Sequence, residues 1–147
     1  MRLENLLKQG NLARHKTSER EIEDVLSIIE RDLKDASLRG LSPDRRFITA
    51  YNAILQEATV LLHLQGFRAR GEGHHYFTFE ALRGILGRRY EPLMDYFQAC
   101  RDKRNISDYD RAGIVTETEV MSLLREAKKF NKLVRGYVSR GRLYLSY

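Results

Sequence analysis

The chain has 147 residues, which is most simply one domain and is long enough to bury a good hydrophobic core. Apolar residues make up 42% and charged residues 31%, a balance that excludes an intrinsically disordered chain. The net charge of +6 favours an anionic partner, with RNA or nucleotide ahead of membrane lipid, although a basic surface can also serve solubility alone.

Residues 1–17 carry a short apolar pattern that Gly10 interrupts, followed by basic residues. This pattern predicts a loosely docked N-terminal arm or half-helix. The first residues contain no hydrophobic stretch of the kind found in secretion signals, so we expect the protein in the cytoplasm.

Two long helices are predicted next. A capping box begins at Ser18, and an apolar stripe follows it until Gly40 ends the first helix. The second helix begins at Ser42 and Pro43 and runs to Gly66. Its apolar residues surround more than one face, which predicts a central buried helix, and it is too polar for a membrane span.

A narrow polar stripe runs along this second helix, formed by Asn52, Gln56, Thr59 and His63. Buried polar side chains need hydrogen-bond partners, so the stripe either holds such bonds or faces a cleft. Exposure of the stripe to solvent is an equally good interpretation. His63 has no second histidine beside it in the sequence and is taken as solitary.

The stretch from Gly66 to Tyr76 is rich in glycine and predicts a loop, after which Thr78 is expected to cap a shorter helix. The loop contains the adjacent pair His74 and His75. Adjacent side chains point in different directions, and no Glu-x-x-His or His-x-x-x-His pair completes a helical site, so we expect neither a metal nor a cofactor. The pair can still act as a lid or donate hydrogen bonds to phosphate.

The next helix begins near Pro92, and its apolar face continues to Cys100, which we interpret as a core residue and not a nucleophile. As the only cysteine, it excludes an intrachain disulfide and a thiolate metal cluster. The same face then carries Arg101 and Arg104. Because an unpaired buried charge is costly, these arginines either reach solvent or meet carboxylates, a second copy of the chain or a phosphate.

The residues best suited to phosphate chemistry follow one another here: Arg101, Arg104, Asn105, Asp108 and Tyr109. Guanidinium groups stay charged and bind phosphate through two hydrogen bonds, and an amide can orient a sugar or phosphate oxygen. A metal-free ribonuclease also needs a base and an acid. Histidine suits this role near neutral pH, whereas Asp108 is a weak base and Tyr109 a weak acid. An alternative of equal weight is a structural Arg104–Asp108 ion pair that anchors the turn.

A polar connection leads to a second capping box at Thr116, where a last long helix begins and runs to Tyr137. After Gly141 the tail predicts a short strand or an interaction strip; residues 138–147 are treated as a C-terminal tail. Together the patterns predict a single all-α domain, an up-and-down bundle of about four or five helices.

Three pieces of the sequence, taken in order, resemble the HEPN (higher eukaryotes and prokaryotes nucleotide-binding) domain family. They are Ala50-Tyr51-Asn52-Ala53 with Glu57, then Gly66-Phe67-Arg68 with Gly73-His74-His75-Tyr76, then Arg101-x-x-Arg104-Asn105 leading to Asp108-Tyr109. The similarity spans roughly residues 18–137. It is of the kind seen in prokaryotic members encoded beside minimal nucleotidyltransferases or in toxin–antitoxin and defence loci.

The resemblance implies an antiparallel helical bundle and a homodimer whose two arginine motifs share a cleft. In HEPN ribonucleases the motif is an arginine, a polar residue and a histidine a few residues later. Arg104 and Asn105 match the first two positions, but Asp108 stands where the histidine is expected. The chain therefore has the anion-binding part of the motif without its usual base.

Three interpretations follow. In the first, the chain is a binding protein in which Arg101, Arg104, His74, His75 and Asn52 hold RNA or a nucleotide. Its protein partner would be a nucleotidyltransferase or a cognate toxin or antitoxin. In the second, it is a metal-independent endoribonuclease toxin in which one of the two adjacent histidines serves as the base. In the third, the arginine cluster only stabilises a dimer.

Overall fold

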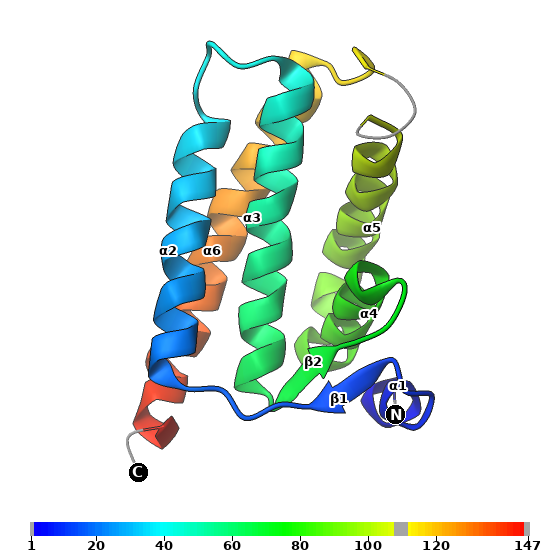
Figure 1. Cartoon of the computed structure of the whole chain (residues 1–147), viewed down its shortest axis with the longest axis vertical. Helices are drawn as coiled ribbons and strands as arrows, with labels where there is room; N and C mark the ends of the chain where they lie inside the picture. Colours follow the sequence, from blue (N-terminus) through cyan, green and yellow to red (C-terminus); the bar gives the residue numbers. More distant parts are fainter. Residues whose placement is uncertain (1, 108–111, 146–147) are drawn as a thin grey trace.

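The structure is a computed structural model that describes residues 2–107 and 112–145, with side chains as far as residue 141. It confirms the all-α helical bundle (Figure 1). The long helices are α2 (Glu19–Ala36), α3 (Pro43–Leu64), α5 (Glu91–Asn105) and α6 (Glu117–Leu145). They run alternately up and down the long axis of the molecule. Asp108 and Tyr109, both expected at the site, lie outside the described residues.

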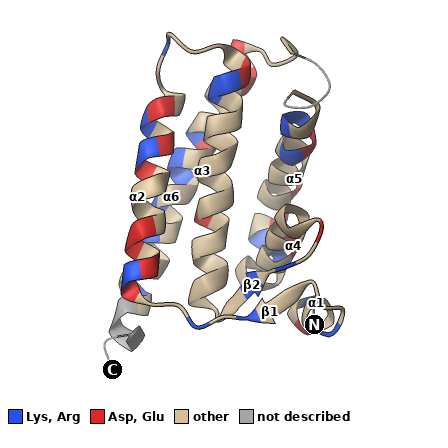
Figure 2. Cartoon of the chain, in the orientation of Figure 1, with Lys and Arg blue, Asp and Glu red and all other residues tan. Residues whose placement is uncertain are grey.

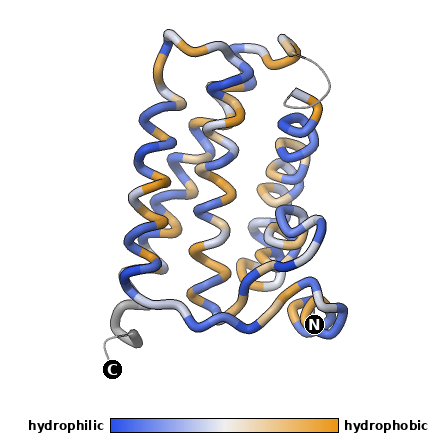
Figure 3. Tube along the Cα trace, viewed as in Figure 1, coloured by the Kyte–Doolittle hydropathy of each residue, from blue (hydrophilic) through white to orange (hydrophobic). Residues whose placement is uncertain are grey.

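α3 is the central helix of the bundle. α2 and α6 pack against it, and α4 and α5 cover another part of its surface. Ala50, Ile54 and Ala58 of α3 have no exposed surface. Figure 3 shows the hydrophobic residues along this helix, and Figure 2 shows far more charge on α2 than along most of α3. The prediction of a central buried helix is therefore confirmed.

The helix starts follow the predicted capping signals. The Ser18 hydroxyl accepts a hydrogen bond from the Glu21 amide at 3.1 Å, and the Ser42 hydroxyl accepts one from the Arg45 amide at 3.2 Å. Thr116 and the residue three positions later cap each other reciprocally at the start of α6. These local signals predict helix starts well because each bond joins neighbours in the sequence.

The N-terminal residues are more ordered than a loosely docked arm. They form a short helix, α1 (Arg2–Lys8), and a strand, β1 (Leu12–Arg14). β1 pairs in antiparallel register with β2 (Phe67–Ala69), and Leu12 lies opposite Ala69. Leu6 and Leu12 are buried in a second, smaller core with Leu62 and Ala81. The half-helix was predicted, whereas the strand was not.

α4 (His74–Leu86) begins earlier than the sequence predicted. Thr78 is not its cap: it lies inside the helix, and its hydroxyl donates to the His74 carbonyl at 2.7 Å. The helix starts at Gly73, which adopts a left-handed conformation with φ of 75°. The histidine pair therefore belongs to the first turn of a helix and not to a loop. A short 3-10 helix, η1 (Arg88–Tyr90), connects α4 to α5.

The expectation of a strand after Gly141 is wrong, because α6 continues as a helix to Leu145. Gly141 fits inside the helix because it lies against α3: a Cβ atom there would stand 3.2 Å from the Leu64 side chain. A glycine at this point allows the two helices to approach closely. None of the described helices has an apolar stretch long enough to cross a bilayer.

The end of the bundle where α3 begins is held by two polar side chains. Arg46 is buried; its Nε donates to the Ala36 carbonyl at the end of α2, and its Nη1 donates to Glu117 at the start of α6, both at 2.9 Å. Asp44 accepts hydrogen bonds from the Gly113 and Val115 amides just before α6. These contacts join three helices at one end.

Candidate anion-binding site

A pocket of about 200 Å³ lies between the first turn of α4 and the last turns of α5. It is lined by Gly73, His74, His75, Tyr76, Arg101 and Asn105. The histidines expected from one segment and the arginine and asparagine expected from another therefore meet around one pocket.

The N-terminus of α4 forms one wall of this pocket. The first amides of any helix lack partners inside the helix, and the helix dipole places partial positive charge at the same end. Among the described residues, no side chain caps this end. Gly73 permits the left-handed turn that leads into the helix, because positive φ carries little steric cost for glycine. Backbone N–H groups near a pocket are a common way to bind an anion.

Arg101 forms the opposite wall and is held in place by its neighbours. Its Nε donates to Gln98 Oε1 at 3.0 Å, and its guanidinium lies 5.5 Å from the centroid of the Tyr76 ring. Gln98 in turn donates to the Tyr76 carbonyl at 2.9 Å. Asp102 also pairs with the Arg101 guanidinium, at 3.1 Å. These contacts tie α5 to the first turn of α4 and fix the position of the arginine.

Arg104 is half-buried and, unlike Arg101, does not line the pocket itself. Its guanidinium is 5.9 Å from the centroid of the Tyr51 ring, and its Nη1 donates to Asn105 Oδ1 at 3.2 Å. Tyr51 is fully buried, and its hydroxyl has no hydrogen-bond partner among the described residues. Burial raises the pKa of this phenol, while Arg101 and Arg104 act in the opposite direction. Two positive charges thus lie within electrostatic reach of one buried aromatic ring.

The pKa of His75 is affected by its burial and by the positive charges around the pocket. It is half-buried, and its ring centroid lies 4.5 Å from that of His74 and 6.2 Å from that of Tyr51. Burial lowers the pKa of His75 to about 4, with further lowering by His74, Arg104 and Arg101. The imidazole is therefore neutral at physiological pH, and one of its nitrogens can accept a proton or a hydrogen bond.

The site agrees only in part with the sequence prediction. Asn52 is half-buried in α3 and does not line the pocket. Gly73 and Tyr76 line it but were not selected as site residues from the sequence. A glycine directly before a polar pair was the available signal for Gly73. For Tyr76 the signal was its place in the Gly73-His74-His75-Tyr76 piece of the HEPN resemblance, whereas its contact with Arg101 of another helix could not be predicted from the sequence.

The structure also bears on two other predictions, which concern Cys100 and His63. Cys100 is buried in the core, and burial raises the pKa of its thiol to about 12, so it is not a nucleophile. His63 is not solitary, because it lies near His15 and Glu21 at the base of the bundle.

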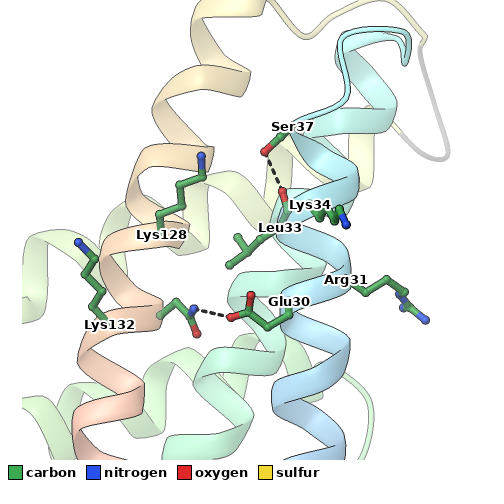
Figure 4. Close-up of a pocket in the computed structure, with 8 residues that line it drawn as sticks. Glu30, Arg31, Leu33, Lys34, Ser37, Lys128 and Lys132 are labelled. Atoms are coloured by element: carbon green, nitrogen blue, oxygen red, sulfur yellow. Dashed lines mark hydrogen bonds between the residues drawn. The ribbon is translucent and has the colours of Figure 1, made fainter.

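A larger pocket, of about 730 Å³, lies between α2 and α6 (Figure 4). Lys128 and Lys132 extend from α6, and Arg31 extends from α2 away from the groove. Its polar contacts connect the two helices: Glu30 accepts hydrogen bonds from Asn131 at 3.3 Å and from Arg135 at 2.7 Å. This groove is a weaker candidate, because its cations diverge and its carboxylate is already bonded.

Comparisons with protein-family models, with curated proteins and with solved structures gave no significant match to this chain.

Proposed function

We propose that the chain is a HEPN-like protein that binds RNA or a nucleotide through a phosphate group held in the pocket between α4 and α5. The observation that carries this proposal is the uncapped N-terminus of α4 facing a pocket that Arg101 also lines. Backbone amides, a helix dipole and a guanidinium fork all favour a tetrahedral oxyanion.

The ring beside the pocket favours a nucleotide over inorganic phosphate. Tyr76 is 39% exposed and already lies next to Arg101. Exposed tyrosines next to cationic side chains provide surfaces on which nucleobases stack. The net charge of +6 adds long-range attraction for a polyanion.

The HEPN resemblance supports the same proposal and extends it to partners. It implies a homodimer that acts with a nucleotidyltransferase or as part of a toxin–antitoxin or defence pair. In a dimer of the family type, two such arginine motifs face a common cleft, which would lengthen the track available to RNA.

A second candidate, a metal-independent endoribonuclease, is favoured by one arrangement: His75 and Arg101 line the same pocket, and burial lowers the pKa of His75 so that its imidazole is neutral. In this reaction His75 takes the proton of the 2′-hydroxyl, and O2′ forms a bond to phosphorus. The bond from phosphorus to the 5′-oxygen breaks, and that oxygen takes up a proton from solvent. Arg101 and Arg104 stabilise the charge that builds on the phosphate oxygens.

The binding proposal is tested by fluorescence anisotropy with a labelled single-stranded RNA over a series of salt concentrations. We expect Arg101→Gln and Arg104→Gln each to weaken binding about tenfold at low salt, because each removes a charge-assisted contact. Each should also lower the slope of log affinity against log salt by about one. Arg31→Gln is the matched control, since Arg31 is an exposed arginine on α2 that pairs with Asp32. Equal weakening by all three variants would contradict a localised site.

The ribonuclease candidate is tested separately with a mixed RNA in the presence of EDTA. Cleavage that is lost in His75→Gln but kept in His74→Gln supports it. If wild-type protein binds RNA without cleaving it, the binding proposal alone stands. If Arg104→Gln abolishes dimerisation in sedimentation experiments and no variant or wild-type protein binds RNA, the arginine cluster serves only to stabilise a dimer.

A further inference from the structure

The base of the bundle contains a second cluster of polar side chains, contributed by three segments, and none of them lines the α4–α5 pocket. His15 follows β1, Glu21 lies in the first turn of α2, and His63 lies in the last turn of α3. One ligand atom from each of these side chains lies within 4.8 Å of the others. The fold therefore brings the imidazole of His63, at the end of α3, to a second imidazole and a carboxylate at the start of α2.

The distances are those of a compact cluster. His15 Nε2 lies 2.6 Å from Glu21 Oε1, and His63 Nδ1 lies 3.2 Å from the same oxygen. The two imidazole rings lie side by side, with centroids 4.2 Å apart. In a tetrahedral zinc site with bonds near 2 Å, neighbouring ligand atoms are separated by roughly 3.3 Å. The 3.2 Å between His63 Nδ1 and Glu21 Oε1 is close to this value, whereas the 2.6 Å between His15 Nε2 and that oxygen has to lengthen.

We propose that His15, Glu21 and His63 form a binding site for a divalent transition-metal ion, with Zn²⁺ as the first choice. Nitrogen ligands from imidazole together with one carboxylate oxygen suit Zn²⁺, and Mg²⁺ and Ca²⁺ prefer all-oxygen sites. Three protein ligands leave a fourth position for water.

A purely hydrogen-bonded cluster accounts for only part of this arrangement. Glu21 Oε1 already accepts hydrogen bonds from His15 and from Thr17, whose hydroxyl is 2.7 Å away. His63 Nδ1 is buried and lies 3.2 Å from the same oxygen, but that contact lacks the geometry of a hydrogen bond. A buried nitrogen whose polar contact is poorly aligned is costly, and a metal ion would use its lone pair directly.

The backbone holds two of the ligands in place. The His15 amide donates to the Gly66 carbonyl at 2.8 Å, and the Glu21 amide is fixed by its capping bond to Ser18.

Access to the cluster is sufficient for an ion to enter. The side chains of His15, Glu21 and His63 are 21%, 37% and 13% exposed. Thr17 lies behind the carboxylate and orients it, which is the usual role of a residue that bonds to a ligand. The positive charge of Arg68 on β2 acts on His63 and opposes the binding of a cation.

The experiment uses the full chain without a histidine tag, treated with EDTA and then freed of chelator. Cobalt(II) is titrated as a spectroscopic probe, and Zn²⁺ is then added to displace it. We expect one equivalent per chain, a visible absorption band from four-coordinate cobalt, and a rise in melting temperature with Zn²⁺ of about 5 °C. His15→Gln and Glu21→Gln should each weaken Zn²⁺ binding at least about tenfold.

A double variant, His74→Gln with His75→Gln, is the matched control because it removes the other adjacent histidines and should bind Zn²⁺ as the wild type does. Far-UV circular dichroism checks that each variant is folded. Binding that is unchanged in Glu21→Gln, or that disappears only in the His74/His75 variant, would overturn the proposal. So would wild-type protein whose melting temperature does not change with Zn²⁺. RNA binding measured in EDTA is a separate readout and does not depend on this site.

Discussion

Glu57 is buried in the middle of α3 with no exposed surface, and neither of its carboxyl oxygens has a hydrogen-bond partner among the described residues. Burial raises its pKa well above the ordinary value, Glu30 raises it further, and Arg135 acts in the opposite direction. The unfolded chain releases this proton at a lower pH than the folded chain does. The contribution of Glu57 to the free energy of unfolding is therefore fully present below the unfolded pKa of 4.5, and it is lost as the pH rises.

Replacing Glu57 with glutamine removes this dependence of stability on pH and keeps the shape of the side chain. We expect Glu57→Gln to raise the melting temperature by about 5 °C at pH 8 and by much less at pH 5, as measured by scanning calorimetry. The control is Glu72→Gln, an exposed carboxylate in the connection before α4. A gain in melting temperature that is equal at both pH values would contradict the argument.

His75 gives a second prediction at this scale, from its pKa of about 4. Its NMR titration should show this low value, and Arg101→Gln should raise it because one source of positive potential is lost. Bound RNA should raise it further. Because the pKa of His75 is lower in the folded chain, its contribution to the free energy of unfolding is present above pH 6.5 and is lost as the pH falls toward 4.

At the scale of the elements, Arg46 connects the end of α2 to the start of α6 through its two bonds of 2.9 Å. We expect Arg46→Ala to lower the free energy of unfolding by about 2–3 kcal/mol, because a buried carbonyl loses its donor. Urea denaturation measures this. Arg45→Ala is the control, since Arg45 is exposed and its change should stay within about 0.5 kcal/mol. Equal losses for both variants would assign the effect to helix propensity instead.

The elements also show how far the sequence predicts the fold. The starts of α2, α3 and α6 were predicted because Ser18, Ser42 and Thr116 bond to amides three residues away. The start of α4 was missed because it uses the backbone freedom of Gly73 and no side-chain cap. The strands were missed because three residues carry little periodicity, and their pairing joins distant segments.

The candidate site was likewise predicted where its residues are neighbours in the sequence, and it was missed where contacts join distant segments. The two arginines were selected because they share one face of one helix, a local property of the sequence. The contact between Tyr76 and Arg101 and the contact of His63 with Glu21 depend on how helices pack, which periodicity alone does not determine. Asn52 was chosen from a polar stripe, and packing leaves it outside the pocket.

For the whole molecule, the question is whether the small N-terminal core unfolds together with the main bundle. Leu12 is 2% exposed and packs with Leu62, which is part of α3. We expect Leu12→Ala to lower the global stability by about 2–4 kcal/mol in a single transition monitored by circular dichroism. Leu38→Ala is the control, because Leu38 is 52% exposed. An unchanged main transition in Leu12→Ala would mean that the N-terminal segment detaches on its own.

The pairing of β1 with β2 also constrains the order of events during synthesis on the ribosome. Leu12 meets a partner more than fifty residues later in the chain, and the leucines of α1 pack beside α4. Because residues 2–14 are synthesised before these partners, they wait several seconds, at about 5–20 residues per second, until the partners emerge. During that interval their leucines are exposed to solvent, so chaperones that recognise short apolar segments can bind this segment of the nascent chain.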